Sequence, residues 1–135
     1  MTLNYAVEDG LGAEEFVDVL KRSGLDARRP ADKPDIIRGM VDNASLVVTA
    51  RDGDGRLVGV ARSVTDFAYC CYLSDLAVDR DCQRQGIGKE LIRRTKEAAG
   101  GDKISLLLLS VPDGMEYYPK IGLDSFDNCF GIRQG

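Results

Sequence analysis

Hydrophobic residues follow two different spacings along the chain, and these spacings separate predicted helices from predicted strands. Apolar residues recur every three to four positions in residues 13–20 and 87–98, which predicts two amphipathic helices. Gly24 and the Gly100–Gly101 pair follow these segments and predict where the helices end. Continuous or alternating apolar residues predict strands at residues 3–7, 46–50, 56–64, 68–78, 104–111 and 125–132, with two shorter helices at residues 35–41 and 115–120.

The order of these elements predicts the fold class. They follow one another as β-α-α-β-β-β-α-β-α-β, which indicates an α/β protein with a central mixed β-sheet flanked by helices. Segments 68–78 and 104–111 carry apolar residues on both faces, so both are predicted to be strands covered on two sides. The helix over residues 85–99 joins them and must pack against the sheet between them. A chain of 135 residues suits one ordinary domain, so residues 1–135 are predicted to form a single domain.

Composition narrows the classes of function. The 22 acidic residues outnumber the 18 basic residues, and a net charge of −4 argues against a dedicated nucleic-acid-binding protein. No apolar run is long enough to span a membrane, and no basic segment followed by an apolar core begins the chain. We therefore expect no membrane association and a cytoplasmic protein. The sequence contains no histidine, which excludes Ser-His and Cys-His catalysis. The four cysteines match no zinc-binding spacing, so we expect reduced, mostly buried thiols and no metal.

Residues 76–89 carry the most informative chemistry. They run from a predicted buried strand, through a polar turn containing Gly86 and Gly88, into the helix over residues 85–99. Unpaired N–H groups at a helix start attract an anion, and glycines let a phosphate approach the backbone. Residues 79–97 contain six basic and four acidic side chains, although a solvated helix face alone accounts for most of these charges. The segment therefore predicts a site for a phosphate-containing ligand.

Two common nucleotide-binding motifs do not fit this segment. The GxGxxG fingerprint requires a third glycine at the position of Leu91, and nothing in the chain supplies the GxxxxGK[ST] phosphate loop. These residues therefore exclude both a dinucleotide fingerprint and a Walker-type loop.

Three blocks of residues instead resemble one family. Gln83-x-x-Gly86-x-Gly88 is similar to the [RQ]-x-x-G-x-[GA] pyrophosphate loop of the GNAT superfamily of N-acetyltransferases. Upstream, residues 76–78 (Leu-Ala-Val) resemble the splayed strand of that family. Downstream, residues 117–123 (Tyr-Tyr-Pro-Lys-Ile-Gly-Leu) resemble its aromatic-Tyr-x-Lys-x-Gly segment. The blocks occur in the family's order, so the chain resembles a GNAT N-acetyltransferase.

This resemblance covers residues 46–130 and implies a GNAT-like acyl-CoA N-acyltransferase fold. It implies acetyl-coenzyme A (acetyl-CoA) as co-substrate, no metal, and direct acetyl transfer to a primary amine of a small molecule or peptide in a ternary complex. Tyr118 matches the tyrosine that protonates the departing thiolate, a role that suits a phenol with a pKa of about 10. Tyr117 is expected in the core. The residues implied to bind the pantetheine arm and the pyrophosphate are Leu76, Ala77, Val78, Gln83, Arg84, Gln85, Gly86, Ile87, Gly88 and Lys89.

The sequence leaves the general base, the acceptor and the oligomeric state open. Asp75 at the strand end and Asp66 in the preceding turn are candidate bases, alongside ordered water. An acyl-cysteine route through Cys70 or Cys71 lacks a histidine to lower the thiol pKa. Outside residues 79–97 the chain is acidic, and the long-range field of those charges favours a cationic acceptor. Many family members are dimers, so a homodimer is one open alternative. A non-catalytic acyl-CoA sensor with the same fold is the alternative function.

Overall fold

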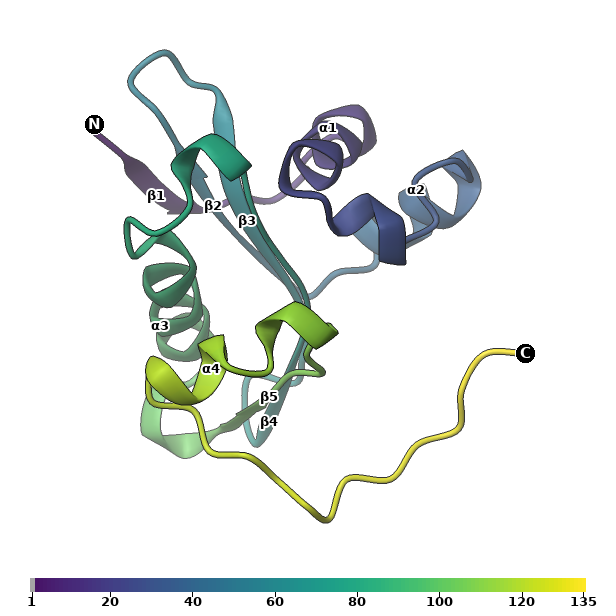
Figure 1. The fold of residues 1–135 in the computed structure, drawn as a ribbon, viewed down its shortest axis with the longest axis vertical. Coiled ribbons are helices and arrows are strands. Elements are labelled where there is room, and N and C mark those ends of the chain that lie inside the picture. The colour runs from purple at the N-terminus through teal and green to yellow at the C-terminus, as the bar shows by residue number, and fades with distance from the viewer. Residues whose placement is uncertain (1) are drawn as a thin grey trace.

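The computed structural model describes residues 2–135 and contains a five-stranded sheet in the order β1-β2-β3-β4-β5 (Figure 1). Neighbouring strands are antiparallel from β1 to β4, whereas β4 and β5 are parallel. The predicted mixed sheet is therefore confirmed. The strands are β1 (Asn4–Val7), β2 (Leu46–Arg51), β3 (Leu57–Thr65), β4 (Cys70–Val78) and β5 (Ser105–Leu107).

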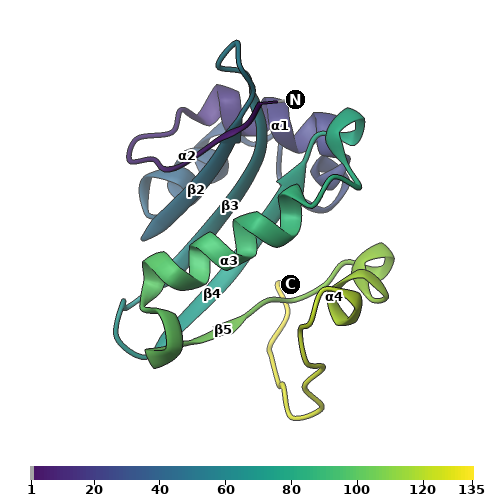
Figure 2. The ribbon, with the colours of Figure 1, turned by 90° about the vertical axis from the view of Figure 1, so that its left-hand side faces the viewer.

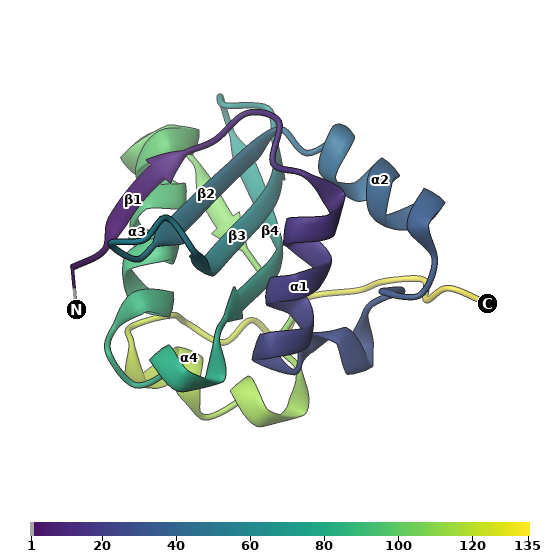
Figure 3. The ribbon, with the colours of Figure 1, turned by 90° about the horizontal axis from the view of Figure 1, so that it is seen from above.

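Helices cover both faces of the sheet. On one face lie α1 (Ala13–Ser23) and α2 (Pro34–Asp42), and on the other lie α3 (Ile87–Ala99) and α4 (Tyr117–Lys120), as Figures 1 and 3 show. Helix α3 connects the parallel strands β4 and β5 and runs along the sheet, as predicted (Figure 2). Within residues 2–135, every helix is too short or too polar to cross a membrane. Short 3₁₀ turns occupy Leu25–Arg28, Arg80–Cys82, Gly101–Lys103 and Pro112–Gly114.

A hydrophobic cluster lies on each side of the sheet. Phe16 of α1 and Ile37 of α2 are fully buried in one cluster, and Ile87 and Leu91 of α3 are fully buried in the other. A Cβ at Gly59 of β3 would lie 3.1 Å from side-chain carbons of both Ile87 and Leu91. The glycine in the centre of the sheet therefore allows α3 to approach β3 closely.

Strand β4 separates from β5 after a short paired stretch. Residues 70–72 pair with β5, whereas on the opposite side β4 stays paired with β3 as far as Val78. Residues 73–78 therefore have no neighbouring strand on the β5 side. The strand predicted over residues 104–111 is wrong beyond Leu107. The physical reason is that β4 has moved away, which leaves residues 108–111 without a neighbouring strand.

A β-bulge at Ser74 bends β4 where this separation begins. The register of β3 against β4 shifts by one residue between Arg62 and Ser63, so Ser74 is an extra residue on β4. Leu73 and Leu76 are three positions apart yet pack against the same hydrophobic cluster, whereas a regular strand would direct them to opposite faces. The bulge therefore changes which β4 side chains face α3, and it redirects the end of the strand.

Two further predictions about strands are wrong. Residues 125–132 form no strand, and Phe130 and Ile132 are almost completely exposed because no neighbouring strand lies beside them. Strand β4 is covered on two sides only in its second half, and Tyr72 in its first half is 41% exposed. On that face the helices reach Asp75 and Ala77, which are buried, and end before Tyr72.

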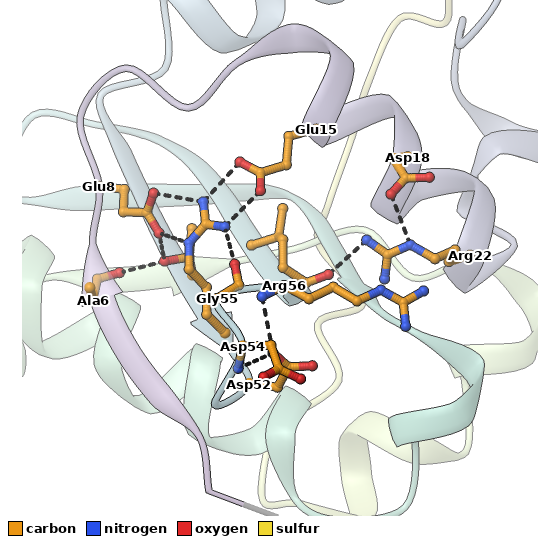
Figure 4. A network of polar contacts seen from close by, with 12 residues as sticks. Ala6, Glu8, Glu15, Asp18, Arg22, Asp52, Asp54, Gly55 and Arg56 are labelled. Carbon is orange, nitrogen blue, oxygen red and sulfur yellow. Dashed lines mark hydrogen bonds and ion pairs between the residues drawn. The ribbon is translucent and has the colours of Figure 1, made fainter.

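A network of ion pairs fastens the N-terminal segment and α1 to the β2–β3 hairpin (Figure 4). Arg51, the last residue of β2, donates from Nε to Glu8 at 2.8 Å and from Nη1 to Glu15 at 2.6 Å. Its Nη1 also donates to the carbonyl of Gly55 in the hairpin turn at 2.9 Å. These hydrogen bonds from Arg51 are the main cause that lowers the pKa of both Glu8 and Glu15.

We expect the free energy of unfolding to decrease on acidification through Glu8 and Glu15. Their pKa values lie below the ordinary 4.5 in the folded protein, so the unfolded chain binds more protons. The stability contributed by these carboxylates is therefore present above about pH 4.5 and is lost as the pH falls through the lower folded-state values. Arg51→Met removes the partner that Glu8 and Glu15 share. The urea midpoint for unfolding of this variant should therefore depend less steeply on pH than that of the wild type, between about pH 5 and 3.

Arg38→Met is the matched control for this experiment, because the Arg38–Asp35 pair is largely exposed and 3.6 Å apart. Its urea midpoint should follow the wild-type pH dependence. An unchanged slope in Arg51→Met would show that the network does not contribute to acid sensitivity.

Candidate active site

The separation of β4 from β5 opens a pocket that side chains reach from both faces of the sheet. Leu25 and Arg29 line it from the connection between α1 and α2, Ser74 and Leu76 from β4, and Tyr118 from α4. The pocket is small and open to solvent. Strand separation therefore brings together segments that are distant in the sequence.

The glycine loop, residues 83–89, joins the end of β4 to α3. Gln83 donates from Nε2 to the carbonyl of Val78 at 3.0 Å, which ties the loop to the strand end. Gly86 is the N-cap of α3 with a φ of 81°, a left-handed conformation that favours glycine. A Cβ at Gly86 would meet no atom within 4 Å, so the space beside it is open. The N–H groups of Ile87 and Gly88, at the start of α3, lack partners within the helix and are available to an anion.

Only some of the basic side chains near the loop are free to contact a ligand. Arg84 and Lys89 are exposed, and among residues 2–135 neither takes part in an ion pair. Arg93 and Arg94, further along α3, both contact Glu90 at 2.7 and 2.8 Å, and their hydrogen bonds lower the pKa of Glu90 to about 2. The positive charge that can meet a ligand at the start of α3 is therefore that of Arg84 and Lys89.

A wider hollow of about 320 Å³ lies beside the loop, between α3 and the segment after α4. Gly86, Lys89 and Arg93 line it from the α3 side, and Ile121 and Leu123 line it from the other side. Glu90 also lines the α3 side and pairs with Arg93, so Lys89 supplies the net positive charge there, and the other wall is apolar. This combination suits a ligand that carries both anionic and apolar groups.

Tyr118 lies in the wall of the pocket between the strands. Burial raises the pKa of its phenol above 10.0, Tyr117 adds to this effect, and the positive charge of Arg29 opposes it. Tyr118 is therefore protonated at neutral pH and can donate a proton. A Cβ at Gly114 would lie 2.9 Å from the Tyr118 ring, so the glycine makes room for that ring.

Tyr117 does not lie in the core, in contrast to its predicted position. It is 38% exposed, and a Cβ at Gly88 would lie 2.7 Å from its hydroxyl oxygen. Burial raises the pKa of Tyr117, while a hydrogen bond from the backbone N–H of Lys89 opposes that rise. The second glycine of the loop therefore admits the Tyr117 hydroxyl to the start of α3. No spacing in the sequence indicates this contact.

Asp75 is completely buried between two arginines. Its two carboxylate oxygens accept hydrogen bonds from Nε of Arg29 and Nε of Arg62. The same arginines also hold the bulge, because Arg29 Nη2 donates to the Ser74 carbonyl at 2.8 Å and Arg62 Nη2 donates to the Ser74 hydroxyl at 3.0 Å. These surroundings favour a positioning role for Asp75, since both of its oxygens are engaged. Arg29 is 46 positions from Asp75, which explains why sequence reasoning missed it.

Asp66, the other candidate base, lies at the beginning of β4, whereas the glycine loop follows its end. Its carboxylate accepts hydrogen bonds from the backbone N–H groups of Ala68, Tyr69 and Cys70 at 2.9, 2.8 and 3.2 Å. These bonds hold the pKa of Asp66 at about 2. Asp66 therefore stabilises the β3–β4 turn.

The cysteines divide into two buried and two exposed thiols. Cys71 and Cys82 are buried, and burial raises the pKa of both thiols, which disfavours the nucleophilic thiolate. Cys70 and Cys129 are exposed, so the expectation of mostly buried thiols is correct for only half of them. Among the residues that the structure describes, no group of three or more His, Cys, Asp or Glu side chains could hold a metal ion.

A parallel strand pair that separates beside a glycine-capped helix start defines the acyl-CoA N-acyltransferase class of folds. The chain belongs to the acetyltransferase (GNAT) family, because residues 13–122 match the sequence profile of that family. The resemblance predicted from the glycine loop is therefore confirmed.

Two curated relatives are N-acetyltransferases described as uncharacterized and named ycf52. The protein from Pyropia yezoensis is 28% identical over 99 residues, and that from Porphyra purpurea is 26% identical over 102 residues. In both cases the match covers 70% of this chain and 55% of the relative. The chain thus spans little more than half the length of these relatives.

Solved structures share the fold at low sequence identity. A ribosomal-protein-alanine N-acetyltransferase from Brucella melitensis is 24% identical with a TM-score of 0.71, covering 98% of this chain and 100% of that chain. A GNAT family acetyltransferase from Streptococcus pneumoniae is 19% identical with a TM-score of 0.74, covering 98% and 97%. An aminoglycoside acetyltransferase from an uncultured soil sample, in complex with sisomicin, is 17% identical with a TM-score of 0.71, covering 98% and 95%. At these identities the likeness concerns the fold alone.

Proposed function

We propose that the protein is an acetyl-CoA-dependent N-acetyltransferase that acts on a primary amine of a small molecule or peptide in a ternary complex. The observation that carries this proposal is the gap between β4 and β5. Free strand backbone, the amide-rich start of α3 and the phenol of Tyr118 all border this gap or its continuation. Acetyl-CoA supplies an activated thioester when it is bound.

The residues around the gap suit the parts of acetyl-CoA. Apart from the Val78 carbonyl, which Gln83 binds, the backbone of residues 76–78 offers hydrogen bonds to an extended amide-containing chain, as in the addition of a strand to a sheet edge. Amides at the start of α3, together with Arg84 and Lys89, suit a pyrophosphate. Open space beside Gly86 leaves room for that group.

Tyr118 is assigned the role of general acid, since its phenol is protonated at neutral pH and lines the pocket. A backbone N–H near Leu76 or Val78 is placed to stabilise negative charge on the reacting carbonyl oxygen, a contact worth about 3 kcal/mol in other enzymes. Asp75 has both carboxylate oxygens bound to arginines, and Asp66 lies at the other end of β4. We therefore assign removal of the acceptor's proton to water.

The class of acceptor is supported by the names of structural neighbours. An aminoglycoside acetyltransferase and a ribosomal-protein-alanine N-acetyltransferase share this fold, and both names refer to amine-bearing acceptors. Family membership supports an amine acceptor for this chain as well. The four free cysteines agree with a location in the reducing cytoplasm, which we also propose.

Saturation with coenzyme A should stabilise the fold. At one hundred times its Kd, a ligand that binds only the folded state adds about 2.7 kcal/mol to the free energy of unfolding. For a domain of this size we expect an increase in Tm of roughly 10 °C, measured by calorimetry. Pantetheine lacks the pyrophosphate and should shift Tm far less. No shift at millimolar coenzyme A would refute the proposed donor.

A further inference from the structure

Arg29 enters the wall of the pocket with part of its hydrogen-bonding capacity unused. An arginine has five N–H donors, and Arg29 directs three of them to Asp75, to the carbonyl of Arg28 and to the carbonyl of Ser74. The remaining donors are one N–H on Nη1 and one on Nη2, and guanidinium groups bind carboxylates through such pairs of donors. The side chain is 21% exposed and lines the pocket.

The cluster that holds Arg29 carries surplus positive charge. The single negative charge of Asp75 is shared between Arg29 and Arg62, and the Arg62 side chain is only 8% exposed. Arg29 is the one charged side chain among the described residues that line the pocket. Two arginines that share one carboxylate leave the cluster with one net positive charge, which favours the binding of an anion.

Arg29 also lies close enough to Tyr118 to influence it. Its positive charge acts on the Tyr118 phenol, and both side chains line the same pocket. A group bound by Arg29 would therefore sit beside the proposed general acid. The remaining wall is largely apolar and includes Leu25, Leu108 and Val111, which suits a small apolar substituent.

We propose that Arg29 binds a carboxylate of the acceptor, so that the preferred acceptors are amines with a neighbouring carboxylate, as in a free amino acid. This inference rests on the proposed N-acetyltransferase function and specifies its substrate class. Outside residues 79–97 the chain is acidic, and the long-range field of those charges favours a cationic acceptor over one with a carboxylate. Salt screens that field beyond about 10 Å, however, whereas Arg29 acts within the pocket.

Binding measurements test this inference without relying on turnover. The protein saturated with coenzyme A is titrated calorimetrically with a panel of free amino acids and with their carboxamides, which keep the amine and the side chain but lack the carboxylate. At least one amino acid should bind about tenfold to hundredfold more tightly than its carboxamide. Equal binding in every pair, or no binding of any amino acid, would overturn the inference.

Arg29→Gln should abolish this preference, and Arg29→Lys should keep part of it because the charge remains without the paired donors. Arg29 also supports Asp75 and Ser74, so a purely structural effect would weaken both members of a pair equally and leave their ratio unchanged. Arg28→Gln is the matched control, since it removes the same charge from an exposed neighbouring side chain. It should retain the full preference.

The two proposals can fail separately. Carboxylate-selective binding without acetyl transfer to any amine would support the role of Arg29 and refute the proposed function. Acetyl transfer at equal kcat/KM to amino acids and carboxamides would support the proposed function and overturn the role of Arg29.

Discussion

Replacing Gly86 with aspartate is expected to weaken coenzyme A binding more than about 100-fold, whereas asparagine should weaken it about tenfold or less. Both side chains are tolerated in the left-handed conformation better than most, so the strain at a φ of 81° is nearly the same in the two variants. They differ in one negative charge at the start of α3, where the pyrophosphate is proposed to bind. Two charges 4 Å apart interact by about 4 kcal/mol near a protein surface, enough for the expected difference.

Gly10→Asp and Gly10→Asn provide the matched control. Gly10 has a φ of 80° and open space around it, but it follows β1 at the opposite edge of the sheet. Neither control should change the Kd for coenzyme A, as measured by calorimetric titration. Equal affinities of Gly86→Asp and Gly86→Asn would mean that the glycine loop does not bind the pyrophosphate.

Tyr118→Phe should reduce kcat by about 100-fold and leave the KM for acetyl-CoA nearly unchanged. The variant keeps the ring and its packing but removes the proton proposed for the departing thiolate. Because burial raises the pKa of this phenol above 10.0, the protonated and active form persists at neutral pH. Activity that depends on Tyr118 should therefore decline only above about pH 10, and that decline should be absent from the variant.

Two tyrosines serve as controls for the loss of a hydroxyl. Tyr69→Phe changes an exposed side chain in the turn before β4 and should leave both kinetic constants unchanged. Tyr117→Phe removes a hydroxyl that contacts the start of α3, so it should change the KM for acetyl-CoA more than kcat. Full kcat in Tyr118→Phe would refute its assignment as general acid.

Local sequence patterns predicted the helices and the first strands well, because each of these elements carries its own periodic face or turn. The segment 13–20 and the Gly24 that follows it correspond to α1 and its left-handed C-cap. The strands at residues 104–111 and 125–132 are predicted from continuous or alternating apolar residues. This pattern cannot show that a bulge at Ser74 removes the neighbour of residues 108–111, because this effect depends on pairing between distant segments.

The residues of the candidate site likewise divide into those that the sequence could predict and those that it could not. The glycine loop is contiguous, so its motif could be recognised, and the left-handed Gly86 agrees with the role expected for that glycine. Arg29 and Arg62 could not be linked to Asp75, because tertiary structure brings them together across 46 and 13 positions. The sequence therefore offers Asp75 only as one candidate base, without the two arginines that the structure places on its carboxylate.

The most direct test of the proposed function is a search for acetylated product. The purified chain is incubated with isotopically labelled acetyl-CoA and a pooled panel of amines and free amino acids, and all products are analysed by mass spectrometry. We expect the labelled acetyl group on the nitrogen of at least one acceptor, an equal amount of free coenzyme A, and no product with Gly86→Asp. Coenzyme A binding without any labelled amine would contradict the account and favour an acyl-CoA sensor.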